Sequence, residues 1–184
     1  FCGCLSSAQN PEMTVKLADG RAIRCELLPE YAPNTVACII YLAQQGYYDG
    51  KVFHRAAPGF VIQAGSRDGE GRGGADFTIK GEFAQNGYKK NTLSHTRGVL
   101  SLARSQVSMD SGSSQFFICL DDVSASLDGL YAAFGRVLDE ESMKVVDEIA
   151  ALETDGQIIL DKPVIETVTV DTFGVSYKAP KKAS

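Results

Sequence analysis

The sequence contains no tryptophan and only two histidines, and it has no apolar run near the length that spans a bilayer. A membrane-spanning helix needs about 20 apolar residues, so we expect no membrane association. His54 and His95 stand far apart and complete no set with zinc-site spacing, and the Gly-x-Ser-x-Gly pattern of a nucleophile elbow is absent. These absences predict a protein without a bound metal or cofactor and without the serine chemistry of such hydrolases.

Basic residues are also too few to favour a nucleic-acid partner. Lys and Arg number 18 against 23 Asp and Glu, which gives a net charge of −5. The only basic cluster is KAPKKAS at residues 178–184, which we interpret as a solvated end. The 184 residues suit one domain, at 12–173, with a flexible leader at 1–11 and a C-terminal tail at 174–184.

The cysteines follow no regular spacing, and their number is odd, so they make a poor disulfide framework. We expect free, buried thiols in a reducing compartment, and hence a cytoplasmic protein. The sequence begins with Phe, so an export signal that has been removed stays an open alternative. The five cysteines are Cys2, Cys4, Cys25, Cys38 and Cys119.

Alternating apolar and polar residues dominate the pattern and are interrupted by turn signals. Helical spacing occurs twice, in APNTVACIIYLAQQG at 32–46 and in DEESMKVVDEIAAL at 139–152. A long polar, glycine-rich loop is expected at 65–92. This pattern of seven or eight strands and two helices predicts a mainly β fold, a closed antiparallel β-barrel whose open ends the α-helices cover. The strands are expected at residues 13–17, 21–28, 52–56, 60–65, 98–102, 114–120, 131–137 and 164–171.

The segment GEGRGG at 69–74 satisfies the Gly-x-Gly-x-x-Gly pattern of dinucleotide-binding proteins. That pattern binds a pyrophosphate only where a helix begins directly after the glycines. Here the strand-like ADFTIKGEF follows. We therefore expect these glycines to provide unusual backbone angles in a surface loop.

The segment VFHRAAPGFVIQAG at 52–65 places His54, Arg55 and Gln63 within an apolar strand pair. We expect both histidines of the chain to be structural and hydrogen-bonded to the backbone. Arginine stays protonated at neutral pH and is no general base. An enzyme built on these residues would therefore catalyse a reaction that needs neither proton abstraction nor a covalent intermediate.

Five blocks follow one another along the chain: FHRAAPGFVIQAG, GEGRGG, SHTRGVLSLAR, SSQFFICL and LDGLYAAFGRV. Together, over about residues 13–171, they resemble the cyclophilin family of peptidyl-prolyl cis-trans isomerases. They are more similar to bacterial single-domain members than to typical eukaryotic ones. The resemblance implies the same eight-stranded barrel with two capping helices, a packed barrel interior and a substrate groove on the outer surface.

The implied reaction is rotation about X–Pro peptide bonds in client proteins, which assists folding. Arg55 corresponds to the family's catalytic arginine, and Gln63 to the glutamine that supports it. Amide resonance imposes a barrier of about 18–20 kcal/mol on this rotation. In the twisted transition state the prolyl nitrogen gains a lone pair, which a fixed donor can stabilise.

The resemblance also implies a substrate-binding set, in which most members surround the proline ring and the others lie along the peptide. Phe60, Val61, Phe117, Leu127 and Tyr131 match the first group, and Gly71, Ala103, Arg104 and Gln115 match the second.

The chain departs from many eukaryotic members at three positions. It has Ser126 in place of a Trp, Tyr131 in place of a pocket His, and Val61 in place of Met. The Trp position contributes strongly to cyclosporin binding in the family, so we expect at most weak binding of that drug. The expected partners of a monomeric protein are proline-containing peptides and unfolded clients. A non-catalytic module that holds such peptides in the same groove is the alternative.

Overall fold

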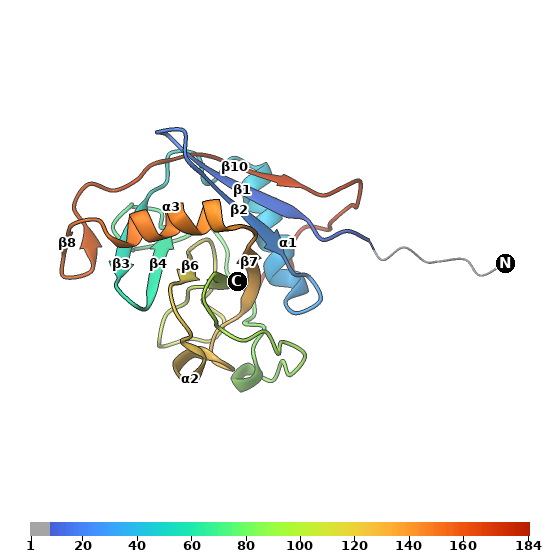
Figure 1. The fold of residues 1–184 in the computed structure, drawn as a ribbon. Coiled ribbons are helices and arrows are strands. Elements are labelled where there is room, and N and C mark those ends of the chain that lie inside the picture. Colours follow the sequence, from blue (N-terminus) through green and yellow to red (C-terminus); the bar gives the residue numbers. More distant parts are fainter. Residues whose placement is uncertain (1–7) are drawn as a thin grey trace.

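The computed structural model describes residues 8–184, so Cys2 and Cys4 lie outside the described residues. The helices are α1 (Pro33–Gln44), α2 (Ser124–Leu127) and α3 (Glu140–Ala150), with a 3-10 turn η1 at Ala84–Asn86. Most of the remaining regular structure is one antiparallel sheet (Figure 1). Its strands are β1 (Glu12–Leu17), β2 (Ala22–Leu27), β3 (Phe53–Ala57), β4 (Val61–Ala64), β5 (Val99–Leu102), β6 (Phe116–Cys119), β7 (Ala133–Val137), β8 (Thr154–Asp155), β9 (Ile158–Ile159) and β10 (Ile165–Asp171).

The strands are paired in the order β10-β1-β2-β7-β5-β6-β4-β3-β9-β8. The chain just before β3 also meets the chain just before β10, where Val52 and Val164 form an isolated antiparallel bridge. Phe53 N donates to Pro163 O at 3.0 Å, and Ile165 N donates to Lys51 O at 2.8 Å. These bonds join the segments before β3 and β10, the strands at the two ends of the series of eight longer strands. The short β8–β9 hairpin is attached to β3.

The eight predicted strands are all present, with ends that differ from the prediction by up to two residues. The two predicted helices correspond to α1 and α3. The sequence did not indicate α2, η1, β8 and β9. Each of these has four residues or fewer, which is too short for a hydrophobic period to appear. In the predicted loop at 65–92, the extended piece FTIKGEF contributes one bridge, between Ile79 and Gly112.

Alternation of strand faces divides the apolar residues into two clusters. On β4, β5 and β6, Ile62, Leu100 and Ile118 belong to the main core, which fills the barrel interior. Their neighbours Val61 and Phe117 belong to a second cluster on the opposite face. The main core is formed by fully buried side chains, which leaves the barrel no lumen for a ligand.

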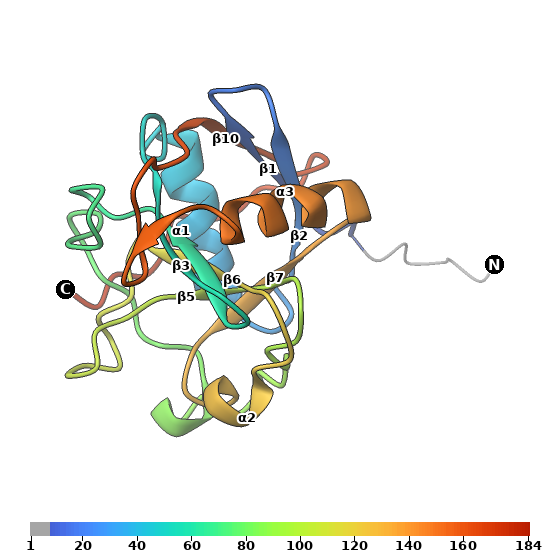
Figure 2. The ribbon, with the colours of Figure 1, turned by 60° about the vertical axis from the view of Figure 1, so that its left-hand side comes forward.

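The two long helices pack on different strands, α3 against β2, β3 and β4, and α1 against β10 and β7 (Figure 2). The α3 helix begins at Asp139, whose carboxylate accepts a hydrogen bond from Ser142 N at 2.7 Å. No side chain of its own segment caps α1. Glu82 does so from a distant loop, because its carboxylate accepts from Thr35 N at 2.6 Å and from Asn34 N at 3.3 Å.

The tail at 174–184 is largely exposed, as we predicted for residues 178–184, but it also forms contacts with the domain. Asn34 and Lys181 exchange two hydrogen bonds, at 2.8 and 3.0 Å. Ala183 N donates to Thr78 O at 2.7 Å, and the ammonium of Lys182 lies 4.9 Å from the centre of the Phe77 ring. At the other end of the domain, Pro11 O accepts from Leu27 N at 2.9 Å, so the last residue of the predicted leader is bonded to β2.

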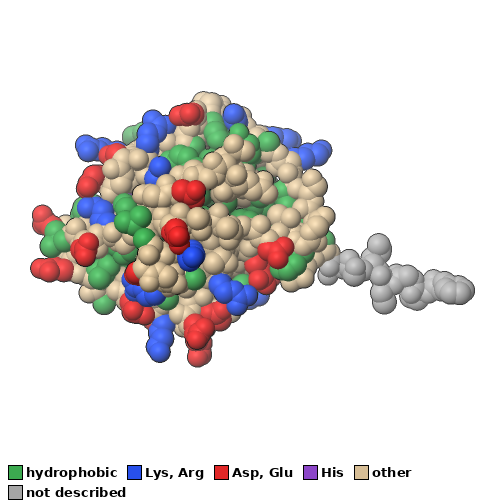
Figure 3. Space-filling view, turned by 90° about the horizontal axis from the view of Figure 1, so that it is seen from above, with side chains coloured by type: hydrophobic (Ala, Val, Ile, Leu, Met, Phe, Trp, Pro, Cys, Tyr) green, Lys and Arg blue, Asp and Glu red, His purple; other side chains and the backbone are tan. Residues whose placement is uncertain are grey.

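Three of the cysteines, Cys25, Cys38 and Cys119, are free and buried, as predicted. Burial raises the pKa of the Cys38 and Cys119 thiols to about 12, which keeps them protonated and unreactive. On the face shown in Figure 3, Lys and Arg side chains are interspersed with Asp and Glu side chains. Among residues 8–184, no helix combines the length and the apolar character that crossing a membrane requires.

Replacing Glu82, the buried residue that caps α1, should destabilise the fold. In Glu82→Gln, the new amide nitrogen would face Asn34 N, so one buried donor loses its acceptor. We expect the free energy of unfolding to fall by about 1–3 kcal/mol, measured by urea denaturation. The exposed Glu30 provides a matched control. Equal stability of Glu82→Gln and Glu30→Gln would show that the cap contributes nothing.

Candidate active site

The second apolar cluster forms the wall of a groove with two adjoining cavities. The first, the apolar cavity, has a volume of about 200 Å³. Gln106, which the sequence did not indicate, lines this cavity. Nine of the eleven predicted site residues also line it: Arg55, Phe60, Val61, Gln63, Ala103, Arg104, Phe117, Leu127 and Tyr131. The second, the amide cavity, has about 330 Å³ and contains the other two predicted residues, Gly71 and Gln115. Gln63, Ala103 and Arg104 line both, so the predicted residues form one continuous site.

Arg55 lies on β3, and two glutamines fix its guanidinium from different sides. Its Nε donates to Gln157 Oε1 at 2.8 Å, and its Nη1 donates to Gln63 Oε1 at 3.0 Å. The ring of Phe60 lies 5.9 Å from the guanidinium carbon. Burial lowers the pKa of Arg55, although arginine remains charged at any physiological pH. Within residues 8–184, Nη2 makes no hydrogen bond, so at least one N–H group remains for a ligand.

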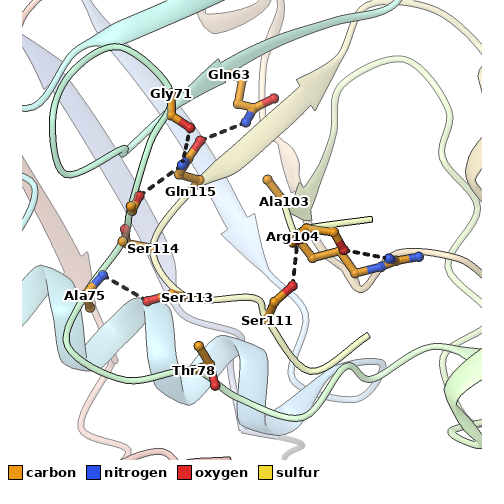
Figure 4. Close-up of a pocket in the computed structure, with 13 residues that line it drawn as sticks. Gln63, Gly71, Ala75, Thr78, Ala103, Arg104, Ser111, Ser113, Ser114 and Gln115 are labelled. Atoms are coloured by element: carbon orange, nitrogen blue, oxygen red, sulfur yellow. Dashed lines mark hydrogen bonds between the residues drawn. The ribbon is translucent and has the colours of Figure 1, made fainter. Parts of the chain in front are cut away.

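The support for Arg55 continues through a chain of side-chain amides. Gln63 Nε2 donates to Gln115 Oε1 at 2.9 Å, and Gln115 Nε2 donates to the backbone oxygens of Gly71 and Gly73, each at 3.0 Å (Figure 4). Gly71 has a φ of 97°, which L-residues with side chains avoid. The glycines of GEGRGG therefore shape a loop, as predicted, and that loop is the end point of the amide chain.

Stacked rings form the back of the apolar cavity. Phe117 and Tyr131 meet edge to face, with centroids 5.6 Å apart and an interplanar angle of 83°. Behind Phe117 lies the imidazole of His95, nearly parallel at 21° and 6.1 Å away. The ring of His95 is itself fixed, because Nε2 lies 2.8 Å from Ser101 Oγ and Nδ1 lies 2.8 Å from Asp128 Oδ1. The Phe117 ring of the cavity wall is thus supported from behind by a second ring, His95, that is itself held in place.

Neither histidine has the backbone hydrogen bonds that we predicted for its ring. The imidazole of His95 binds side chains, and burial lowers its pKa although the Asp128 carboxylate raises it in part. His54 is 2% exposed, and its Nδ1 has no hydrogen-bond partner within the described residues. Its Nε2 lies 3.1 Å from the position that a Cβ on Gly71 would occupy. Burial, with a smaller effect of the Arg55 charge, lowers the pKa of His54 to about 4.

Arg104 also lies between rings. Its guanidinium carbon is 4.7 Å from the centre of the Tyr131 ring and 5.0 Å from that of Phe83. Its Nε and Nη2 donate to Leu130 O at 3.0 and 2.9 Å. Gln106 Nε2 donates to the hydroxyl of Tyr131 at 2.9 Å. These contacts fix the orientation of Tyr131, the residue that stands in place of a histidine.

Three residues that shape this site were not identified from the sequence. Gln157 lies in the turn between β8 and β9, which shows no strand pattern. Gln106 lies in a polar loop, and the role of His95 depends on stacking between distant segments. The only available signal was the pair of β-branched residues after Gln157, which is too short to predict a strand. Within the described part of the chain, no group of three His, Cys, Asp or Glu side chains could hold a metal ion.

A family model described as cyclophilin type peptidyl-prolyl cis-trans isomerase/CLD matches residues 12–175. A peptidyl-prolyl cis-trans isomerase B of Bacillus subtilis is 45% identical over 121 residues, which cover 66% of this chain and 79% of the relative. A peptidyl-prolyl cis-trans isomerase of Helicobacter pylori is 39% identical over 142 residues, which cover 77% of this chain and 82% of the relative.

Solved structures give the same result. A Cryptosporidium parvum cyclophilin type peptidyl-prolyl cis-trans isomerase, crystallised in the presence of the dipeptide Ala-Pro, superposes with a TM-score of 0.74 at 25% identity. The match covers 87% of this chain and 98% of that one. The fold predicted from the element pattern is therefore confirmed, and the match of residues 12–175 spans all eight predicted strands.

The unpaired imidazole of His54 should make stability depend on pH. Because its pKa is about 4 when folded and about 6.5 when unfolded, the unfolded chain takes up the proton first. Stability is complete above about pH 6.5 and should fall by up to about 1.4 kcal/mol per pH unit between pH 6.5 and pH 4. His54→Gln should flatten this slope in urea titrations. An NMR titration that places the His54 pKa near 6.5 would contradict the prediction.

Proposed function

Because the chain belongs to the cyclophilin-type peptidyl-prolyl cis-trans isomerase family and is such an isomerase, we propose that Arg55 is its catalytic donor and that the apolar cavity binds the proline ring. The observation that carries the proposal is the fixed guanidinium of Arg55 at the edge of that cavity, with an N–H group that makes no hydrogen bond within residues 8–184. The roles of the two glutamines and of the cavity wall follow from it.

The chemical step is a rotation, so no proton or covalent bond is exchanged. As the X–Pro bond twists, amide resonance is lost and the prolyl nitrogen becomes pyramidal, with a lone pair. A donor aimed at that nitrogen binds the twisted state more strongly than either planar state, which lowers the barrier. Gln63 and Gln157 hold Arg55 before the substrate arrives, so little reorganisation is needed during the step.

The cavity wall contributes by holding the ring and excluding water. Phe60, Phe117 and Leu127 provide apolar surface of a size suited to a pyrrolidine ring within about 200 Å³. Excluding water lowers the local dielectric constant, which strengthens the hydrogen bond from Arg55 to the prolyl nitrogen. The Ala-Pro dipeptide named with the Cryptosporidium parvum structure supports proline-containing peptides as ligands of this groove. We propose exposed X–Pro segments of unfolded client proteins as the substrates.

The small side chain of Ser126 is exposed at the margin of the groove, on α2. It offers little apolar surface to a large cyclic peptide, so we propose that cyclosporin binds weakly. The alternative function, a binding module with little turnover, has no specific support in the geometry. Its simplest form would lack an ordered guanidinium at the cavity edge, whereas here two hydrogen bonds order it.

Removing the donor should abolish most of the catalysis while binding persists. In Arg55→Ala, we expect kcat/KM for a proline peptide to fall by about 10²-fold, the loss typical of one preorganised donor. Exchange NMR on a short X–Pro peptide measures isomerisation, and the chemical shifts of Phe117 and Tyr131 report binding. If the wild-type protein binds the peptide but does not accelerate its exchange, the binding-module alternative holds and the proposed function is wrong.

Gln157 should act as a positioning residue for Arg55. In Gln157→Ala, we expect kcat to fall about threefold to tenfold with little change in KM, because the guanidinium loses one of its two fixed contacts. The Arg55 Nε–H resonance should move in the same variant. Asp155→Ala, an exposed change in the same hairpin, is the control and should alter neither quantity. An unchanged Nε–H resonance in Gln157→Ala would exclude the positioning role.

A further inference from the structure

The groove contains an unusual distribution of charge. Beside the apolar cavity and the amide cavity lies a third one of about 640 Å³, bordered by Gln85, Met109 and Ser126; we call it the rim cavity. Among all residues that line the three cavities, only Arg55 and Arg104 carry a charge. No Asp, Glu or Lys lines any of them, although the whole chain has a net charge of −5. The groove is therefore positive on an acidic protein.

Both arginines keep their charge uncompensated at short range. The hydrogen-bond partners of Arg104 are the backbone oxygens of Leu130 and Ser105, and its stacking partners are uncharged rings. The partners of Arg55 are the side-chain amides of two glutamines. Within residues 8–184, neither guanidinium lies within ion-pair distance of a carboxylate, whereas most other arginines of this region do.

Arg104 is also placed where it can contact a substrate beside the proline. It lines all three cavities, and only Gln63 and Ala103 share with it the boundary between the apolar and amide cavities. A peptide whose proline occupies the apolar cavity must cross this boundary as it continues into the amide cavity. Because Arg104 lines this boundary, we expect the residue next to the proline to come close to its side chain, which stacking contacts with Tyr131 and Phe83 hold in place.

On the basis of the function proposed above, we infer that the groove selects X–Pro bonds in which X is acidic, and that Arg104 is the specificity-determining residue. A Glu or Asp side chain at X would supply the carboxylate that Arg104 lacks. A Lys or Arg side chain there would meet a like charge. An ion pair at a half-exposed position is worth up to about 1 kcal/mol, so the expected preference is about fivefold.

The test uses three peptides with blocked ends, Ala-Glu-Pro-Phe, Ala-Gln-Pro-Phe and Ala-Lys-Pro-Phe, with kcat/KM measured by exchange NMR. For the wild-type protein we expect the order Glu, Gln, Lys, with about a fivefold ratio between the first and the last. The ratio should decrease toward one when the salt concentration rises from about 0.02 M to about 0.5 M, because salt screens exposed charges.

Two substitutions and one control assign the effect to Arg104. Arg104→Gln should bring the Glu-to-Lys ratio close to one, and Arg104→Glu should reverse it. Each ratio compares the Glu and Lys peptides with the same variant. A general loss of activity caused by the lost Tyr131 contact affects both peptides and therefore cancels in the ratio. Lys178→Gln removes one positive charge from the tail, which lines none of the three cavities, and should leave the ratio unchanged.

The outcomes separate this inference from the function on which it rests. If the wild-type protein accelerates all three peptides equally, the specificity inference is wrong while the isomerase function stands. The same follows if Arg104→Gln keeps the wild-type ratio, or if Lys178→Gln abolishes it. If no peptide is accelerated, the proposed function itself fails. Circular dichroism and melting curves show whether each variant is folded, and Arg104→Gln alone decides the question if Arg104→Glu is not.

Discussion

The register between β4 and β6 is the constraint on which both the core and the site depend. Ile62 pairs with Ile118, while Gln63 pairs with Phe117. The first pair points into the barrel, and the second points into the groove. Because side chains alternate along a strand, a slip of one residue would exchange the two faces. A slip of β4 would place the Gln63 amide in the core and Ile62 on the groove. The apolar core therefore fixes the positions of Gln63 and Phe117 in the groove.

The polar part of the site follows a second constraint, since a half-buried guanidinium needs partners that do not neutralise it. A carboxylate on Arg55 would form an ion pair and compete with the prolyl nitrogen for its donors. Amide oxygens orient the guanidinium and leave its full charge available. The chain from Gln63 through Gln115 to the backbone of Gly71 supplies such partners in series. This explains why the groove contains glutamine where many active sites contain acidic residues.

Much of this arrangement could be predicted from the sequence, and the rest could not, for identifiable reasons. Alternation predicts the longer strands, and the resemblance of the five blocks to the cyclophilin family predicts the residues of the groove. Hydrogen bonds between distant segments leave no periodic signal. Glu82 caps a helix 47 residues away from it in sequence, and Gln157 reaches Arg55 across 102 residues. The contacts of the tail could not be predicted either, because its exposed lysines suggest only solvent, whereas Pro180 is buried and the ammonium of Lys182 lies over the Phe77 ring.

The tail links the domain boundary to the groove. Thr78 lines the amide cavity, and it also pairs with the tail through Ala183 N at 2.7 Å and Ser184 O at 3.1 Å. One residue before it, Phe77 O accepts from Ser113 Oγ at 2.7 Å, and Ser113 lines the same cavity. Ala183 and Ser184 lie after residue 175, where the family model ends. Residues outside the family match thus take part in the contacts of one wall of the groove.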